Sequence, residues 1–62
     1  MKTIIVLDYR VGKTYLIPFN TELDIPDELD EREAIEAYIE NKGLSINNCH
    51  YMLVDRLTFE IL

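Results

Sequence analysis

The segment Asp27–Leu44, DELDEREAIEAYIENKGL, decides the fold of this chain, because a helix start, a helix face and a helix end can all be read from it. Asp30 can accept a hydrogen bond from the backbone amide of Glu33, and the Glu33 side chain can reach back to the amide of Asp30. This capping-box pattern predicts that the helix begins directly after Asp30. A start one turn earlier, with Pro26 or Asp27 opening the helix, is the alternative.

The end of the helix is marked by Gly43, which can adopt the left-handed conformation that terminates many helices. Leu44 is then expected to fold back onto Ile39. Between these signals, apolar residues recur at helical spacing and form a single stripe of Ala34, Ile35, Tyr38 and Ile39. We therefore predict a helix from Glu31 to Lys42.

Two apolar segments before the helix predict a β-hairpin. Lys2–Leu7, KTIIVL, is apolar or β-branched at odd and even positions alike. This is typical of a strand buried on both faces, or covered by the helix on one face and by a partner on the other. Asp8–Lys13 turns the chain, with Gly12 supplying a positive φ, and Thr14–Phe19 is the returning strand. Pro18 favours an edge position for that strand, because proline cannot donate to a ladder.

After the helix, Ser45–Asn48 is expected to be a loop, and from Cys49 onward apolar residues alternate with period two. This region is either one long or bent strand, or two short strands broken at Asp55-Arg56. We favour one strand, because that dipeptide lacks the glycine that a two-residue hairpin prefers. The predicted fold is α+β: a single β-β-α-β domain over residues 1–62, with strand order 2-1-3 and the helix on one face of the sheet.

The length and composition describe one small domain. A chain of 62 residues lies near the lower size limit for independent folding and buries only about 60% of its unfolded surface, so a partner or a second copy is a reasonable source of stability. The lone Cys49 excludes an internal disulfide and favours a reducing compartment. No stretch approaches the roughly 20 apolar residues that span a bilayer. We therefore expect a cytoplasmic protein that does not bind a membrane.

The charge is concentrated in one part of the chain. The net charge is −6, and the segment Glu22–Glu40 alone contains nine acidic residues and one base, Arg32. The remaining residues contain three acids and five bases. Binding duplex nucleic acid directly needs a basic patch, which the acidic segment opposes, so a protein with a basic surface is the more plausible partner. The commonest alternative explanation for such a run is a solvated face that aids solubility.

The sequence shows no catalytic or metal-binding pattern. Residues 12–14, GKT, match the end of a phosphate-binding loop, but Leu7 occupies the position of its first glycine and a strand follows instead of a helix. Cys49 and His50 are adjacent on a predicted strand and should point to opposite faces. One His and one Cys cannot complete a zinc site, and the acidic segment lacks the glycine of a calcium loop. We expect no enzyme activity, no cofactor, no metal site and no catalytic residue.

In its short length, acidity and scarcity of cysteine, the chain resembles small inhibitors encoded by phages and other mobile elements. Some of those inhibitors occupy the nucleic-acid groove of a host enzyme with carboxylates in place of phosphates. The resemblance implies a non-enzymatic module whose acidic helix face binds a basic, nucleic-acid-binding surface of a host protein. The candidate partner-binding residues are Asp27, Glu28, Asp30, Glu31, Glu33, Glu36 and Glu40, with Tyr9 and Tyr15 as aromatic anchors.

The alternative function is a self-associating structural domain, such as a homodimer, that binds no ligand. In that case the acidic face serves solubility only. Its support is the two-sided apolar character of the first strand and the apolar residues Phe59, Ile61 and Leu62.

Overall fold

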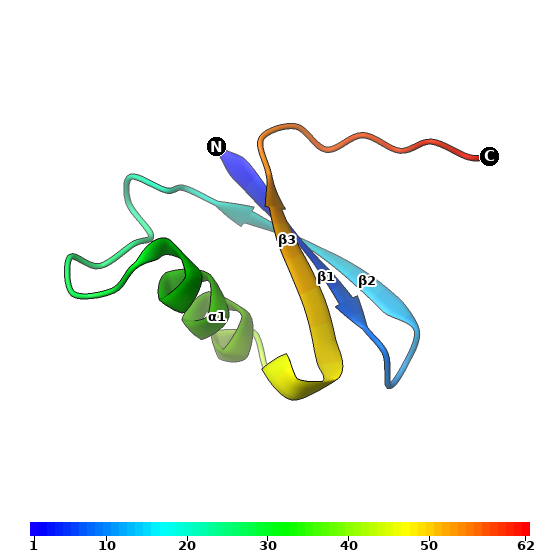
Figure 1. Ribbon diagram of the computed structural model, residues 1–62, viewed down its shortest axis with the longest axis horizontal. Coiled ribbons are helices and arrows are strands. Elements are labelled where there is room, and N and C mark those ends of the chain that lie inside the picture. Colours follow the sequence, from blue (N-terminus) through cyan, green and yellow to red (C-terminus); the bar gives the residue numbers. More distant parts are fainter.

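The computed structural model describes all 62 residues, Met1–Leu62, and contains one three-stranded sheet and one α-helix. The elements follow the chain in the order β1 (Lys2–Asp8), β2 (Lys13–Phe19), α1 (Glu31–Asn41), the short 3-10 helix η1 (Ile46–Asn48) and β3 (Cys49–Val54). The strand order is β2-β1-β3, and both neighbouring pairs are antiparallel. The predicted small α+β fold and the 2-1-3 strand order are therefore confirmed (Figure 1).

The hairpin of β1 and β2 closes where Asp8 pairs with Lys13. Gly12 has a φ of 64°, the positive value that the turn was expected to need. The Asp8 side chain is buried at the end of β1, where its carboxylate accepts a hydrogen bond from the backbone amide of Arg10 at 3.0 Å. The Arg10 guanidinium lies 4.0 Å from the same oxygen. These contacts satisfy a buried carboxylate and fix the turn.

The capping box begins α1 as predicted. The amide of Glu33 donates to Asp30 Oδ1 at 2.8 Å, and the amide of Asp30 donates to Glu33 Oε1 at 3.2 Å. The alternative start at Pro26 or Asp27 is wrong: these residues lie in the preceding loop, where the carbonyl of Pro26 accepts a bond from the amide of Leu29.

The helix ends one residue before the predicted end, with Lys42 as its C-cap. Gly43 has a φ of 85°, and its amide donates to the carbonyl of Glu40 at 2.9 Å. Leu44 is half-buried and packs against the core, as expected after a glycine terminator. The Lys42 ammonium lies 5.2 Å from the centre of the Tyr38 ring, a cation–π contact at the end of the helix.

The core lies between α1 and one face of the sheet. The Phe19 and Tyr38 rings meet edge to face, with their centres 5.4 Å apart, and join β2 to the helix. Half-buried side chains from the loops and from β3 surround this centre. The buried apolar residues are Ile4, Val6, Ile17, Phe19, Ala34, Ile35, Ile39 and Cys49.

The preference for one long C-terminal strand is wrong. β3 ends at Val54, Asp55 and Arg56 form a bend, and residues 57–62 belong to no strand. The reason is the register: Val54 already pairs with Thr3, close to the start of β1, so the alternating residues beyond it have no strand to pair with. We call residues 57–62 the tail. The tail leaves the end of β3 on the side away from α1 (Figure 1).

The expectation that the first strand is buried on both faces is also not met within one chain. Ile4 and Val6 of β1 are buried beneath the helix, whereas Ile5 is half-buried and Leu7 is exposed on the other face.

The helix of the structure is 11 residues long, and no helix combines the length and the apolar character needed to cross a membrane.

Candidate protein-binding surfaces

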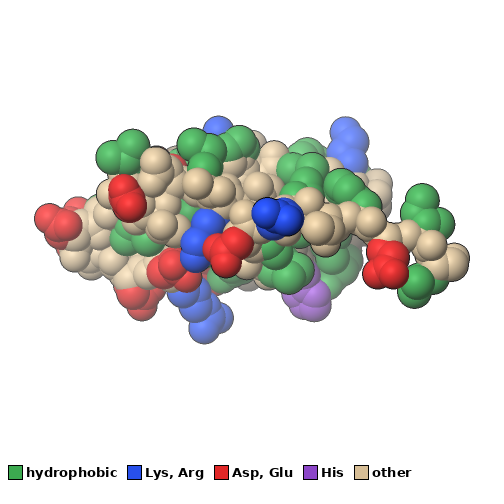
Figure 2. Space-filling view, turned by 90° about the horizontal axis from the view of Figure 1, so that it is seen from above, with side chains coloured by type: hydrophobic (Ala, Val, Ile, Leu, Met, Phe, Trp, Pro, Cys, Tyr) green, Lys and Arg blue, Asp and Glu red, His purple; other side chains and the backbone are tan.

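The predicted acidic residues lie on α1 and on the loop that precedes it, at one end of the molecule. Figure 2 shows most of the acidic side chains gathered at this end, away from the tail. We call the set predicted from the sequence the acidic surface. All of its residues are exposed except Glu36, which is half-buried: Asp27, Glu28, Asp30, Glu31, Glu33, Glu36 and Glu40.

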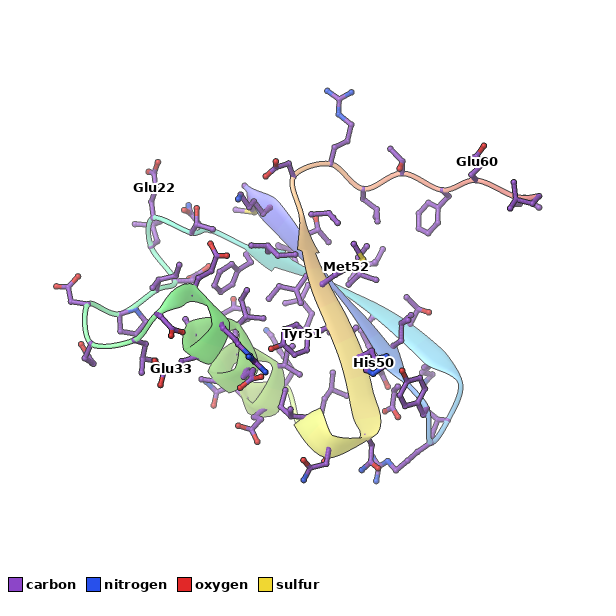
Figure 3. All side chains as sticks on the ribbon, viewed as in Figure 1. Glu22, Glu33, His50, Tyr51, Met52 and Glu60 are labelled. Carbon is purple, nitrogen blue, oxygen red and sulfur yellow. The ribbon has the colours of Figure 1, made fainter.

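Contacts within the chain divide the acidic surface into two groups. In the first group, the side chains of Asp30 and Glu33 form the capping box. Glu36 also belongs to this group, because its carboxylate accepts a hydrogen bond from Tyr51 and is paired with Arg32. The other carboxylates make no hydrogen bond and no ion pair. Glu22 in the loop is equally unpaired, although it was not among the predicted site residues (Figure 3). We call this second group the free carboxylates: Glu22, Asp27, Glu28, Glu31 and Glu40.

Glu36 has a structural role that the sequence pattern did not reveal. The Tyr51 hydroxyl of β3 donates to Glu36 Oε2 at 2.6 Å, and the Arg32 Nε lies 3.5 Å from the same oxygen. Figure 3 shows Tyr51 directed toward α1. The contact ties the helix to the edge strand β3, so Glu36 is partly committed to the fold.

Two pKa shifts follow from this cluster. Burial first, and then the hydrogen bond to the Glu36 carboxylate, raises the pKa of Tyr51, because both disfavour a phenolate. The pKa of Arg32 is raised first by Tyr51 and then by Glu36. Arg32 is the one base within the acidic segment, and its contact with Glu36 leaves the free carboxylates without a counterion from their own chain.

The two predicted aromatic anchors, Tyr9 and Tyr15, have different surroundings. Tyr9 is exposed in the hairpin turn, where its hydroxyl is hydrogen-bonded to Nδ1 of His50 and the two rings meet nearly at right angles. Tyr15 is half-buried against the core and lines a shallow groove with Pro18, Lys42 and Leu44. The hairpin turn lies at the opposite end of the sheet from the loop before α1 (Figure 1), so the structure does not bring Tyr9 to the acidic surface.

Cys49 and His50 point to opposite faces of β3, as their adjacency on a strand predicts. Cys49 is buried, whereas His50 is exposed. Burial first, and then the nearby Asp8 carboxylate, raises the pKa of the Cys49 thiol. The side chains of His, Cys, Asp and Glu form no group of three or more that could hold a metal ion.

A second surface is formed by the side of the sheet that α1 does not cover. The strand register places its side chains in three rows, each crossing from β2 through β1 to β3. The middle row joins Leu16, Ile5 and Met52, and Figure 3 shows Met52 directed away from α1. We call this surface the open sheet face: Thr3, Ile5, Leu7, Thr14, Leu16, Pro18, His50, Met52 and Val54.

Comparison with protein-family models, with curated proteins and with solved structures finds no match to this chain.

Proposed function

We propose that the protein is a non-enzymatic binding module whose acidic surface contacts a basic surface of another protein. The observation that supports the proposal is the set of free carboxylates on α1 and its leading loop, which have no counterion within the chain. Their exposure leaves the carboxylates hydrated and available to the guanidinium and ammonium groups of a partner. Charge-assisted contacts of this kind are the stronger class of hydrogen bond.

The charge balance of the segment favours a basic partner. Glu22–Glu40 contains nine acids and one base, and that base contacts Glu36. A field of one sign accelerates association with an oppositely charged surface and repels surfaces of like charge. Nucleic acid itself is repelled, since its phosphates have the same sign as the carboxylates.

We further propose that the partner surface is one that normally binds nucleic acid. Such surfaces present arginine and lysine side chains spaced to meet phosphates, and carboxylates can take the place of the phosphates. The protein then acts as an inhibitor of the phage or mobile-element type by occupying that surface. The single, buried and unpaired thiol of Cys49 supports a reducing, cytoplasmic compartment for this activity.

Capture from a bacterial lysate with the tagged protein tests the proposal, at about 0.1 M and about 0.5 M salt. The structure favours Glu28→Gln/Glu40→Gln as the test variant, because both carboxylates are free, whereas replacing Glu36 also removes the contact with Tyr51. The control is Asp55→Asn/Glu60→Gln, which removes the same number of exposed carboxylates outside the acidic surface. Asp55 is paired with Lys2 at 3.2 Å, so the control also breaks one exposed ion pair.

The expected result is a nucleic-acid-binding protein that the wild type and the control retain at low salt. The same protein should be lost at high salt, and at low salt the test variant should retain much less of it than the wild type and the control. Adding the module should also reduce the partner's binding to nucleic acid. Retention of nothing by the wild type, or equal retention by all three proteins, contradicts the proposal.

A further inference from the structure

The open sheet face has the composition of an interface and not of a solvated surface. An antiparallel sheet with one face in water normally places polar residues on that face. Here six of the nine side chains are apolar and none is Asp, Glu, Lys or Arg; the polar ones are Thr3, Thr14 and His50. Leu7 and Leu16 are each 44% exposed, and Met52 is 56% exposed.

The apolar side chains are contiguous. Ile5 lies at the centre of the face, paired with Leu16 on one side and with Met52 on the other. Beside them, a hollow of about 110 Å³ is lined by Ile5, Leu7, His50, Tyr51 and Met52. A row of apolar side chains next to a hollow can interdigitate with a similar row from a facing sheet.

The chain exposes more surface than a compact monomer of its mass is expected to expose. A compact monomer of 7.3 kDa is expected to expose about 4,200 Å². The chain exposes 4875 Å², which is about 700 Å² more than that expectation. Each partner in a stable interface of ordinary size buries about 800 Å². This excess, to which the exposed tail contributes, is comparable to one side of such an interface.

The tail extends this apolar surface. Phe59 is 79% exposed, and Ile61 and Leu62 are also exposed. The tail leaves β3 on the side away from α1, which is the side of the open sheet face (Figure 1). The tail therefore lies on the same side as a molecule that covers the open sheet face.

The distribution of charge favours a second copy as the occupant. The free carboxylates lie on α1 and its leading loop, and both of these segments lie on the covered side of the sheet (Figure 1). Two copies that meet through their open sheet faces keep these carboxylates on the outside of the pair, where repulsion is weakest. A charged partner finds no complementary charge on this face, whereas another apolar sheet face buries Ile5, Leu16 and Met52 without leaving a charge unpaired.

We propose that two copies of the chain form a symmetric dimer through their open sheet faces, with the tail of each copy contributing apolar contacts. The two sheets pack face to face at about 10 Å, and the dimer has the layer order helix, sheet, sheet, helix. This inference is independent of the proposed function, because it uses neither the acidic surface nor a basic partner.

Sedimentation velocity of the full chain from about 10 µM to about 500 µM tests the proposal, since the dimer fraction depends on protomer concentration. The expected species has about twice the mass of 7.3 kDa, and about 0.5 M salt does not dissociate it. A monomer throughout this concentration range overturns the proposal.

A pair of variants locates the interface. Leu16→Glu places a carboxylate in the middle row of the open sheet face and should raise the dimer dissociation constant at least about tenfold. Leu23→Glu makes the same chemical change at an exposed leucine in the loop before α1 and should leave the dissociation constant unchanged. If circular dichroism shows that Leu16→Glu is unfolded, Met52→Glu replaces it. If the folded variant, Leu16→Glu or its replacement Met52→Glu, dimerises with the same dissociation constant as the wild type, the proposed interface is wrong.

Discussion

Replacing the N-cap residue Asp30 with alanine should destabilise the protein by about 1 kcal/mol, the typical cost of losing such a cap. In the structure the Asp30 carboxylate accepts the amide of Glu33 at 2.8 Å, and alanine leaves that amide without its partner. A domain of 62 residues is expected to have about 3–9 kcal/mol of total stability, so the loss is a substantial fraction of it. Thermal unfolding followed by circular dichroism should show a midpoint lowered by about 4–8 °C.

Two further variants separate the cap from the charge. Asp30→Asn keeps an acceptor oxygen at the cap and removes the negative charge, so it should cost less than half as much as Asp30→Ala. Asp27→Ala removes a nearby exposed carboxylate that makes no hydrogen bond, and it should change the stability by no more than about 0.5 kcal/mol. If Asp30→Asn costs as much as Asp30→Ala, or if Asp27→Ala costs as much as either, the reasoning from the capping box is refuted.

Two other predictions concern Tyr51 and Cys49, whose pKa values are raised in the folded protein. The pKa of Tyr51 is higher in the folded protein than its ordinary value near 10, so its contribution to stability is fully present below about pH 10 and is lost as pH rises through the folded-state pKa. Urea unfolding at pH 9 to 11 should therefore show a smaller alkaline loss of stability in Tyr51→Phe than in the wild type; equal losses would contradict the assignment. The buried Cys49 thiol, with its raised pKa, should react with a disulfide reagent at least about 100-fold more slowly in the folded protein than in urea. A folded-state rate within a few-fold of the unfolded one would show that the thiol is accessible.

The helix and the hairpin could be predicted because their signals are local. The capping box spans only Asp30 to Glu33, and Gly43 terminates the helix through its own φ of 85°. Gly12 acts in the same way in the hairpin turn. Each of these residues acts through its sequence neighbours alone, so the local sequence was sufficient to predict the helix and the turn.

The C-terminal strand was predicted too long because pairing is not a local property. Period-two alternation continues to Ile61, but a strand also needs a partner, and β1 offers none beyond the pair of Thr3 with Val54. The alternation therefore indicated which residues are apolar without indicating that they pair.

The candidate site shows the same limit. Glu36 looked equivalent to Glu40 from helical spacing, yet Tyr51 donates to Glu36 across 15 positions of sequence, a contact that only the packing of β3 against α1 creates. The apolar character of both faces of β1 was visible in the sequence. The sequence did not show that one face of the sheet stays uncovered, because this depends on the single helix packing against the other face.

The most direct test of the proposed function is the association rate constant with a partner obtained by capture, measured at about 0.05 M and about 0.5 M salt. If the free carboxylates guide binding to a basic surface, the association rate constant should fall at least about tenfold between these conditions, with a smaller change in the dissociation rate constant. An association rate constant that is the same at both salt concentrations would contradict the claim that the acidic surface binds the partner.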